Sequence, residues 1–208
     1  MANTTFKGTL RSEGGYSSIA TTASTGAETT QMSISTAGFT SLDANTMATE
    51  AGTGITGGTG TIYRSSVIRE GGIIKTSILI DLTGLRSTAS GDIIGVNGTS
   101  NVCHIGQITA ARNGTILAGR MTCFEAPAGG DPDINVHSAT ESTGVEDGAI
   151  SDLTETLLVN AGDATTGSIV TFTGVPAADE FLYLTLGATT DADYTAGKLL
   201  IELFGYEA

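Results

Sequence analysis

The chain has 208 residues, of which 39% are hydrophobic and only 15% charged, with 29 glycines, three prolines and no tryptophan. A chain of this length can bury about 70% of its unfolded surface, so one domain can fold without disulfides or metals. The hydrophobic share excludes a wholly disordered chain. The formal net charge of −13 argues against nucleic acid as a partner, because phosphate binding needs a basic surface.

The first eight residues contain no apolar run, so we expect no secretory signal. No stretch approaches the roughly 18 apolar residues of a membrane span, and we expect no membrane partner. These features predict a protein that is made and folded in a cytoplasm.

Charge is distributed unevenly along the chain. Residues 1–120 carry eight basic and seven acidic side chains, whereas residues 121–208 carry fifteen acidic side chains and one basic side chain, Lys198. One interpretation is an acidic surface that aids solubility. The other is a polarised molecule, with a nearly neutral part that docks and an acidic part that faces outward.

Residues 1–60 have the character of an arm and a connector. Residues 4–10 and 31–36 are candidate short strands, and the Gly/Thr-rich residues 51–60 predict a flexible or irregular connector. We therefore place a domain boundary at residue 60, with residues 61–208 as the body.

The clearest strand of the body lies between Gly72 and Gly84. Its even positions are apolar or β-branched from Ile74 to Leu82, and its odd positions are mixed. Alternation with period two predicts a strand with one apolar face. The C-terminal stretch 198–206 is also long and β-rich, which makes it a candidate partner for this strand.

Further strands follow at regular spacing, separated by glycine-rich turns. Asn113-Gly114 lies between two strand-like runs and predicts a type I′ hairpin, because that turn needs positive φ at both central residues. Eight to ten short strands predict an all-β fold, an antiparallel β-sandwich or jelly roll. The expected strands are 61–68, 73–82, 92–96, 101–109, 115–124, 133–138, 156–160, 168–173, 181–187 and 198–206.

The two cysteines, Cys103 and Cys123, fall on the two arms of this expected hairpin. A disulfide is possible in only one of the two hairpin registers. Two buried free thiols are the favoured interpretation for a cytoplasmic product. Zinc bound by both cysteines and His104 is disfavoured, because adjacent strand residues point to opposite faces.

No catalytic constellation is found, so we expect no enzyme and no cofactor. Neither His104 nor His137 has a serine or carboxylate at a spacing typical of a triad. Asp131 and Asp133 are weak calcium candidates, because two carboxylates at this spacing in a loop can present oxygens to a cation. Turn formation is the favoured interpretation of this pair and of Asp191/Asp193. The calcium hypothesis also includes Glu141, Glu146 and Asp147.

Three parts of the chain carry a resemblance. The opening residues 1–15, the Gly/Thr-rich connector and the closing residues 197–203 resemble small virion proteins of tailed bacteriophages of marine bacteria, of the head decoration (cement) or knob type. The resemblance implies a β-sandwich or jelly-roll protein, often trimeric, that binds the major capsid protein and stabilises the shell. It brings no catalytic residues.

The expected function is therefore that of a non-enzymatic virion protein on the capsid surface, assembled in the host bacterial cytoplasm. We expect it to form a homo-oligomer, which the resemblance implies is a trimer, and to dock through its first residues, including Phe6, Lys7 and Arg11. The alternative is a tail, fibre or head-surface knob protein that binds a receptor or glycan. A secreted adhesin or carbohydrate-binding module is disfavoured by the missing signal and the missing tryptophan.

Overall fold

The computed structural model describes residues 16–21, 28–35, 38–42 and 50–207. The chain divides into two compact units, Met1–Met47 and Ala48–Ala208. The described part of the first unit is an antiparallel sheet in the order β1-β2-β3, formed by β1 (Tyr16–Thr21), β2 (Glu28–Ser35) and β3 (Gly38–Leu42).

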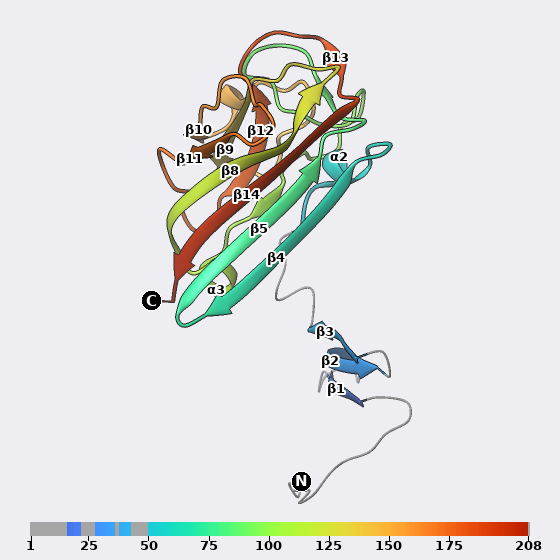
Figure 1. Cartoon of the computed structure of the whole chain (residues 1–208), viewed down its shortest axis with the longest axis vertical. Helices are drawn as coiled ribbons and strands as arrows, with labels where there is room; N and C mark the ends of the chain where they lie inside the picture. Colours follow the sequence, from blue (N-terminus) through green and yellow to red (C-terminus); the bar gives the residue numbers. More distant parts are fainter. Residues whose placement is uncertain (1–15, 22–27, 36–37, 43–49, 208) are drawn as a thin grey trace, which may run out of the picture. The chain divides into compact units, whose positions relative to one another are not determined.

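The second unit is an antiparallel β-sandwich, which confirms the predicted fold class (Figure 1). Its larger sheet has the order β11-β8-β14-β5-β4, and its smaller sheet has the order β10-β9-β12-β7. The larger sheet consists of β4 (Ile62–Glu70), β5 (Ile73–Asp81), β8 (Thr115–Ala128), β11 (Ile169–Thr171) and β14 (Ala196–Tyr206). The smaller sheet consists of β7 (Gly106–Gln107), β9 (Ile134–Ala139), β10 (Glu155–Val159) and β12 (Phe181–Leu186).

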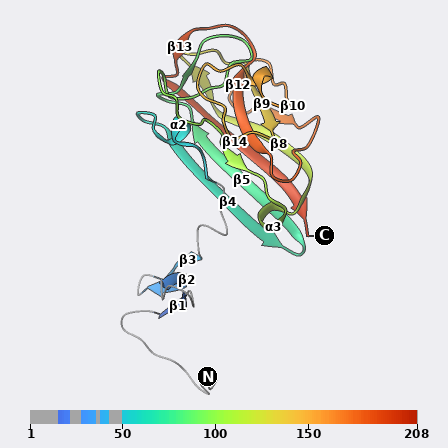
Figure 2. The same ribbon diagram turned by 180° about the vertical axis from the view of Figure 1, so that it is seen from behind.

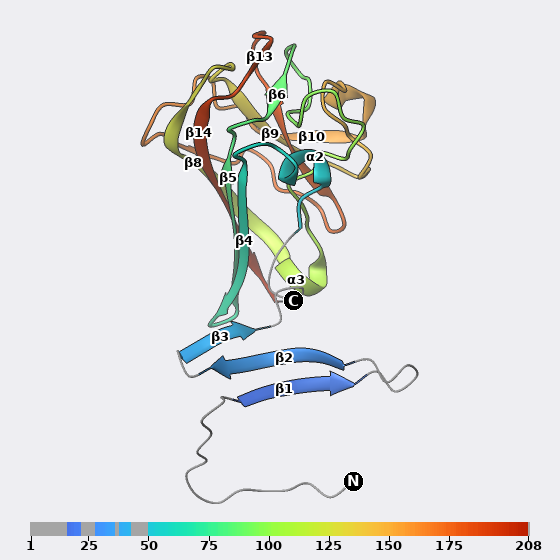
Figure 3. The same ribbon diagram turned by 90° about the vertical axis from the view of Figure 1, so that its right-hand side faces the viewer.

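A short ribbon of β6 (Arg86–Ser87) and β13 (Ala192–Asp193) lies at one end of the sandwich (Figure 3), and β13 is seen there in the two opposite views as well (Figures 1 and 2). Figure 3 shows the larger sheet edge-on, with β9, β10 and α2 (Thr53–Thr56) on the same side of it. In the described residues, no helix is long and apolar enough to cross a membrane.

Strands β5 and β14 form the centre of the larger sheet. They pair over nine residues, from Asp81 opposite Lys198 to Ile73 opposite Tyr206, which confirms the predicted pairing. On β5 the even positions from Ile74 to Ile80 are buried, whereas Lys75, Ser77 and Leu79 are only half-buried. The predicted alternation is therefore also confirmed, because one face of the strand lines the core.

The core lies between the two sheets. The larger sheet contributes Ile78 and Ile80 of β5 and their neighbours on β14 and β8, and the smaller sheet contributes its alternate positions on β9 and β12. Buried side chains of this kind each contribute about 1.5–3 kcal/mol of hydrophobic stabilisation. Between the sheets the fully buried members include Leu82, Met121, Ile134, Val136, Leu182, Leu184, Leu186, Leu199, Ile201 and Leu203.

Loops lie along the edge of β12 that does not pair with β9 and over the second face of the smaller sheet. Ile94 and Ile105 donate backbone hydrogen bonds to Leu184 and Leu182 of β12, at 2.9 and 2.7 Å. Tyr183 donates its hydroxyl to the Glu141 carbonyl oxygen at 2.8 Å. The expected strands 92–96 and 101–109 are therefore mostly loop, with isolated bridges and the two-residue β7. Their apolar residues Ile93, Ile94, Ile105 and Ile108 are nevertheless buried.

The Gly-rich residues 51–60 belong to the second unit, which begins at Ala48 and not at residue 61. They contain α2, and Ile55 within it is fully buried in the core. Gly54 lies so close to the Cys103 sulfur that a Cβ there would be 2.4 Å from it. Glycine serves here for close packing, so the expected irregular connector is a packed segment of the body.

The hairpin predicted at Asn113-Gly114 is wrong. Residues Ala110–Asn113 form the short helix α3, which leads into β8, while β7 belongs to the other sheet. The Asn113 side chain is fully buried, accepts from the Thr109 N–H at 2.9 Å and donates to Thr76 Oγ1 at 2.7 Å. These bonds to another strand favour a helical turn over a two-residue hairpin loop. Only Gly114 has the positive φ, at 67°.

Replacing Asn113 by Ala should lower the free energy of unfolding by about 2–3 kcal/mol, because it leaves the Thr109 N–H and the Thr76 hydroxyl buried without partners. Urea unfolding followed by circular dichroism measures this change. Asn97→Ala is the matched control, since Asn97 also precedes a glycine but is exposed. Equal effects of the two substitutions would contradict the role given to Asn113.

Candidate protein-binding surface

The larger sheet has an outer face that points away from the core. We define it by the outward positions of β4, β5, β14, β8 and β11. Large apolar side chains are exposed on it, among them Ile68 at 52% and Ile169 at 59%. Monomeric proteins rarely expose extended apolar patches, so such a face is typical of a contact surface. The other exposed or half-buried apolar members are Ile62, Ile73, Leu79, Phe124, Leu200, Phe204 and Tyr206.

Two ion-pair clusters lie on this outer face. In the first, Glu202 accepts from Lys75 Nζ and Arg120 Nε, both at 2.5 Å. In the second, Lys198 lies between Asp81, at 3.3 Å from its carboxylate, and Glu125. The Arg120 guanidinium also lies 5.9 Å from the centre of the Phe204 ring, which is within cation–π distance.

The Glu202 side chain is almost fully buried although it belongs to the outer face. Burial by itself raises the pKa of this carboxyl, but the hydrogen bonds and charges of Arg120 and Lys75 outweigh it and hold the pKa below its ordinary value. The pKa of Asp81 is likewise lowered, because hydrogen bonds from Thr83 and Lys198 outweigh the effect of burial. Both carboxylates are therefore charged at neutral pH.

Net charge separates the outer face from the rest of the body. Residues 50–207 contain seven basic and nineteen acidic side chains. The outer face has four of each sign and is neutral, which leaves three basic and fifteen acidic side chains elsewhere. The eight charged residues of the outer face are Arg64, Lys75, Arg120, Lys198, Glu70, Asp81, Glu125 and Glu202.

The cysteines do not face each other across a hairpin, because that hairpin does not form. Both are free and buried. Burial raises the pKa of the Cys103 thiol to about 12, and it also raises the pKa of Cys123. His104 packs its ring against Phe181 and Tyr183, and burial lowers its pKa. This environment fits inert core thiols.

The calcium candidates Asp131 and Asp133 lie together beside β9. Asp131 already accepts from the Asp133 N–H at 2.9 Å and from the Thr190 hydroxyl at 2.8 Å. Asp133 Oδ1 is buried with no hydrogen-bond partner, and its pKa is raised by burial and by the charges of Asp131 and Asp163. Among the described residues, no group of three or more His, Cys, Asp or Glu side chains is placed to hold a metal ion.

The other acidic candidates make contacts of their own. Glu141 accepts from Thr154 through both carboxylate oxygens, and Glu146 accepts from the Gly98 N–H. Asp191 and Asp193 pair with Arg86, the first more closely. His137 lies 2.7 Å from a carboxylate oxygen of Glu155 on the neighbouring β10. His137 and Glu155 are 18 residues apart in the chain, so the sequence alone does not predict this cross-strand pair.

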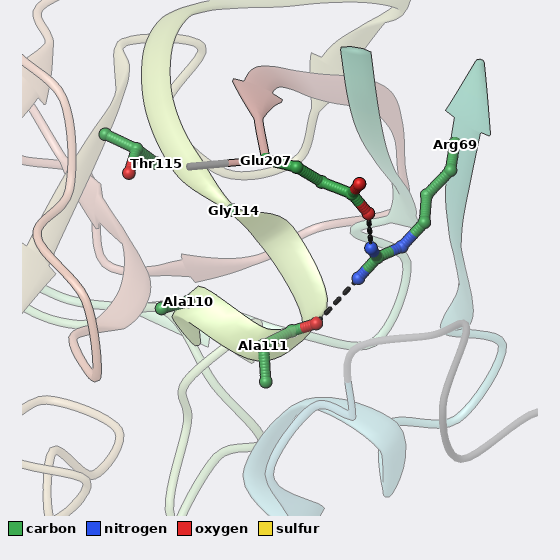
Figure 4. Close-up of a pocket in the computed structure, with 6 residues that line it drawn as sticks. All are labelled: Arg69, Ala110, Ala111, Gly114, Thr115 and Glu207. Carbon is green, nitrogen blue, oxygen red and sulfur yellow. Dashed lines mark hydrogen bonds and ion pairs between the residues drawn. The ribbon is translucent and has the colours of Figure 1, made fainter. Parts of the chain in front are cut away.

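An open cavity of about 330 Å³ lies where β4, α3 and the C-terminal residues meet. Figure 4 shows Arg69 at this site, where it pairs with Glu207 and donates to the Ala111 carbonyl oxygen at 2.6 Å. Because both contacts use the guanidinium, we interpret Arg69 as a structural tie between these segments. The expected docking residues Phe6, Lys7 and Arg11 lie outside the described residues.

Comparisons with protein-family models, curated proteins and solved structures gave no match for this chain. The outer face is therefore interpreted from its own geometry. Sequence reasoning missed both ion-pair clusters, although Lys75, Asp81, Lys198 and Glu202 occupy outward positions of two strands whose pairing was expected. The register of β8, which adds Arg120 and Glu125, has no local sequence signal.

Replacing Glu202 by Gln should lower the free energy of unfolding at pH 7 by about 1–3 kcal/mol, because Lys75 and Arg120 then lack a shared anion. The wild-type contribution is present above the ordinary pKa of 4.5 and is lost as the pH falls through the lowered folded pKa. The difference between the two proteins should therefore shrink in acid. Denaturant titrations at several pH values measure it, with Glu70→Gln as control, and a pH-independent difference would contradict the mechanism.

Replacing Asp133 by Asn should raise the unfolding free energy at pH 7 by about 1 kcal/mol, because it removes a poorly solvated charge beside Asp131 and Asp163. A raised carboxyl pKa means that wild-type stability increases on acidification, so the gain should shrink toward the ordinary pKa of 3.8. Thermal melts of the wild type and the variant, with calcium and with chelator, provide a second measurement. Calcium that stabilises the wild type but not the variant would support a cation site instead.

Proposed function

We propose that this chain is a non-enzymatic structural protein of a phage virion, specifically a decoration protein that binds the major capsid protein and stabilises the shell. It acts as a homo-oligomer on the capsid surface. The alternative role in a tail, fibre or head-surface knob differs in its place in the particle.

The observation that carries the proposal is the contrast between the outer face and the rest of the body. The outer face is neutral and exposes large apolar side chains, whereas the remaining described surface is strongly acidic. A neutral, partly apolar sheet face loses little solvation energy when another protein covers it, so it favours protein contacts. The acidic surface on the rest of the body favours solubility and disfavours binding of nucleic acid. The polarised molecule suggested by the charge pattern is thus supported, with the division set by the sheet and not by position along the chain.

Docking to the shell is assigned to residues 1–15, which precede the described strands. A segment that reaches a neighbouring subunit adds avidity, because its binding becomes intramolecular once the body is bound. The body has a core of its own in the second unit, so the two contributions are separable.

Deleting residues 1–15 should abolish co-sedimentation with purified capsid shells and leave the far-UV circular dichroism of the body unchanged. A finer variant replaces Phe6, Lys7 and Arg11 by Ala, and its matched control replaces three nearby threonines, 4, 5 and 9, by Ala. Loss of binding in the first variant alone supports the proposal. Undiminished binding after the deletion would contradict it, and immunogold labelling of tails instead of heads would favour the alternative role.

A further inference from the structure

The charged residues of the outer face are arranged in rows across β5, β14 and β8. The strand registers align Ser77, Glu202 and Arg120 in one row. The next row is Leu79, Leu200 and Thr122, and the third is Asp81, Lys198 and Glu125. On β5, β14 and β8 the middle row is uncharged and lies between two charged rows, and on the edge strand β4 it continues with Arg64, which pairs with Leu79.

The two charged rows have opposite net charge. Lys75 reaches the first row by pairing with Glu202, so two cations and one anion gather there. The third row holds one cation between two anions. The two clusters therefore have opposite net charge and are separated by Leu79 and Leu200, while Arg64 lies in the middle row and Glu70 lies opposite Ile73, beyond the first row.

A two-fold axis along the middle row has a specific consequence for this pattern. It stacks two outer faces and reverses the strand direction, so the first row of one copy lies over the third row of the other. Glu202 on β14 then faces Lys198, and Arg120 on β8 faces Glu125. Leu79, Leu200 and Arg64 lie on the axis, so each meets the same residue of the second copy, as residues on the axis of an isologous interface do.

We infer that two copies of this chain associate face to face through the outer faces of their larger sheets, about this axis. Aligned sheets pack at about 10 Å with strand directions within about 30°, which fits a two-fold stack of antiparallel sheets. The rest of residues 50–207 carries three basic and fifteen acidic side chains, most of them at the surface, so contacts between copies elsewhere bring like charges together. The inference rests on the proposed function, which includes a homo-oligomer, and it specifies a two-fold contact between the copies.

The test uses the full chain in sedimentation equilibrium, with no capsid present, so its failure is separate from failure of shell binding. The wild type should form an even-numbered assembly. Arg120→Glu should weaken self-association about 100-fold, because the introduced carboxylate faces Glu125 of the second copy. Glu125→Arg should weaken it to a similar degree, because it places two guanidinium groups together.

Mixing the two variants gives the decisive reading. In a mixed pair both contacts join Glu and Arg, so the two proteins should associate with each other although neither associates with itself. Circular dichroism checks that each variant is folded. Asp152→Arg, an equal change of charge at an exposed position on another element, should associate like the wild type. A monomeric or odd-numbered wild type, single variants that associate normally, or folded variants that fail to combine would each overturn the inference.

Discussion

The antiparallel pairing of β5 with β14 is the constraint on which the rest of the sandwich depends. Side chains alternate across a strand, so one register decides both faces of the sheet at once. The same register that sends Ile78 and Ile201 into the core sends Ser77 and Glu202 outward. A slip of one residue would exchange these sets, exposing isoleucine and burying charge. The apolar core therefore fixes the position of every charged group on the outer face.

The outward position of Glu202 does not leave its carboxylate exposed to solvent. Glu202 is buried because it lies between Lys75 and Arg120, whose long side chains cover it while remaining partly exposed themselves. A buried carboxylate is costly unless cations and hydrogen bonds compensate it. The cluster orders this part of the exposed sheet, because its members restrain one another across three strands.

Much of the fold could be predicted because its strands follow period two and end at glycine. The central strand at 73–81 was identified from alternation, and its C-terminal partner from its length and β-rich composition. The apolar residues of 92–96 and 101–109 were misassigned, since a short apolar run can be a strand or a buried loop, and periodicity does not distinguish them. Asn113 was misassigned because its deciding partner, Thr76, is 37 residues away. The charge contrast along the chain predicted that a neutral region exists, but not where it lies. The neutral outer face combines Lys75 and Arg120 with Lys198 and Glu202, which are far apart in the sequence.

The central claim is that this protein acts through contact made by a neutral outer face of its larger sheet. An electron cryomicroscopy reconstruction of the assembled protein tests this claim most directly. The account predicts that Leu79 and Leu200 are covered by protein in the assembly while the acidic loops face solvent. An assembly held together by those loops, with the outer face open to solvent, would contradict it.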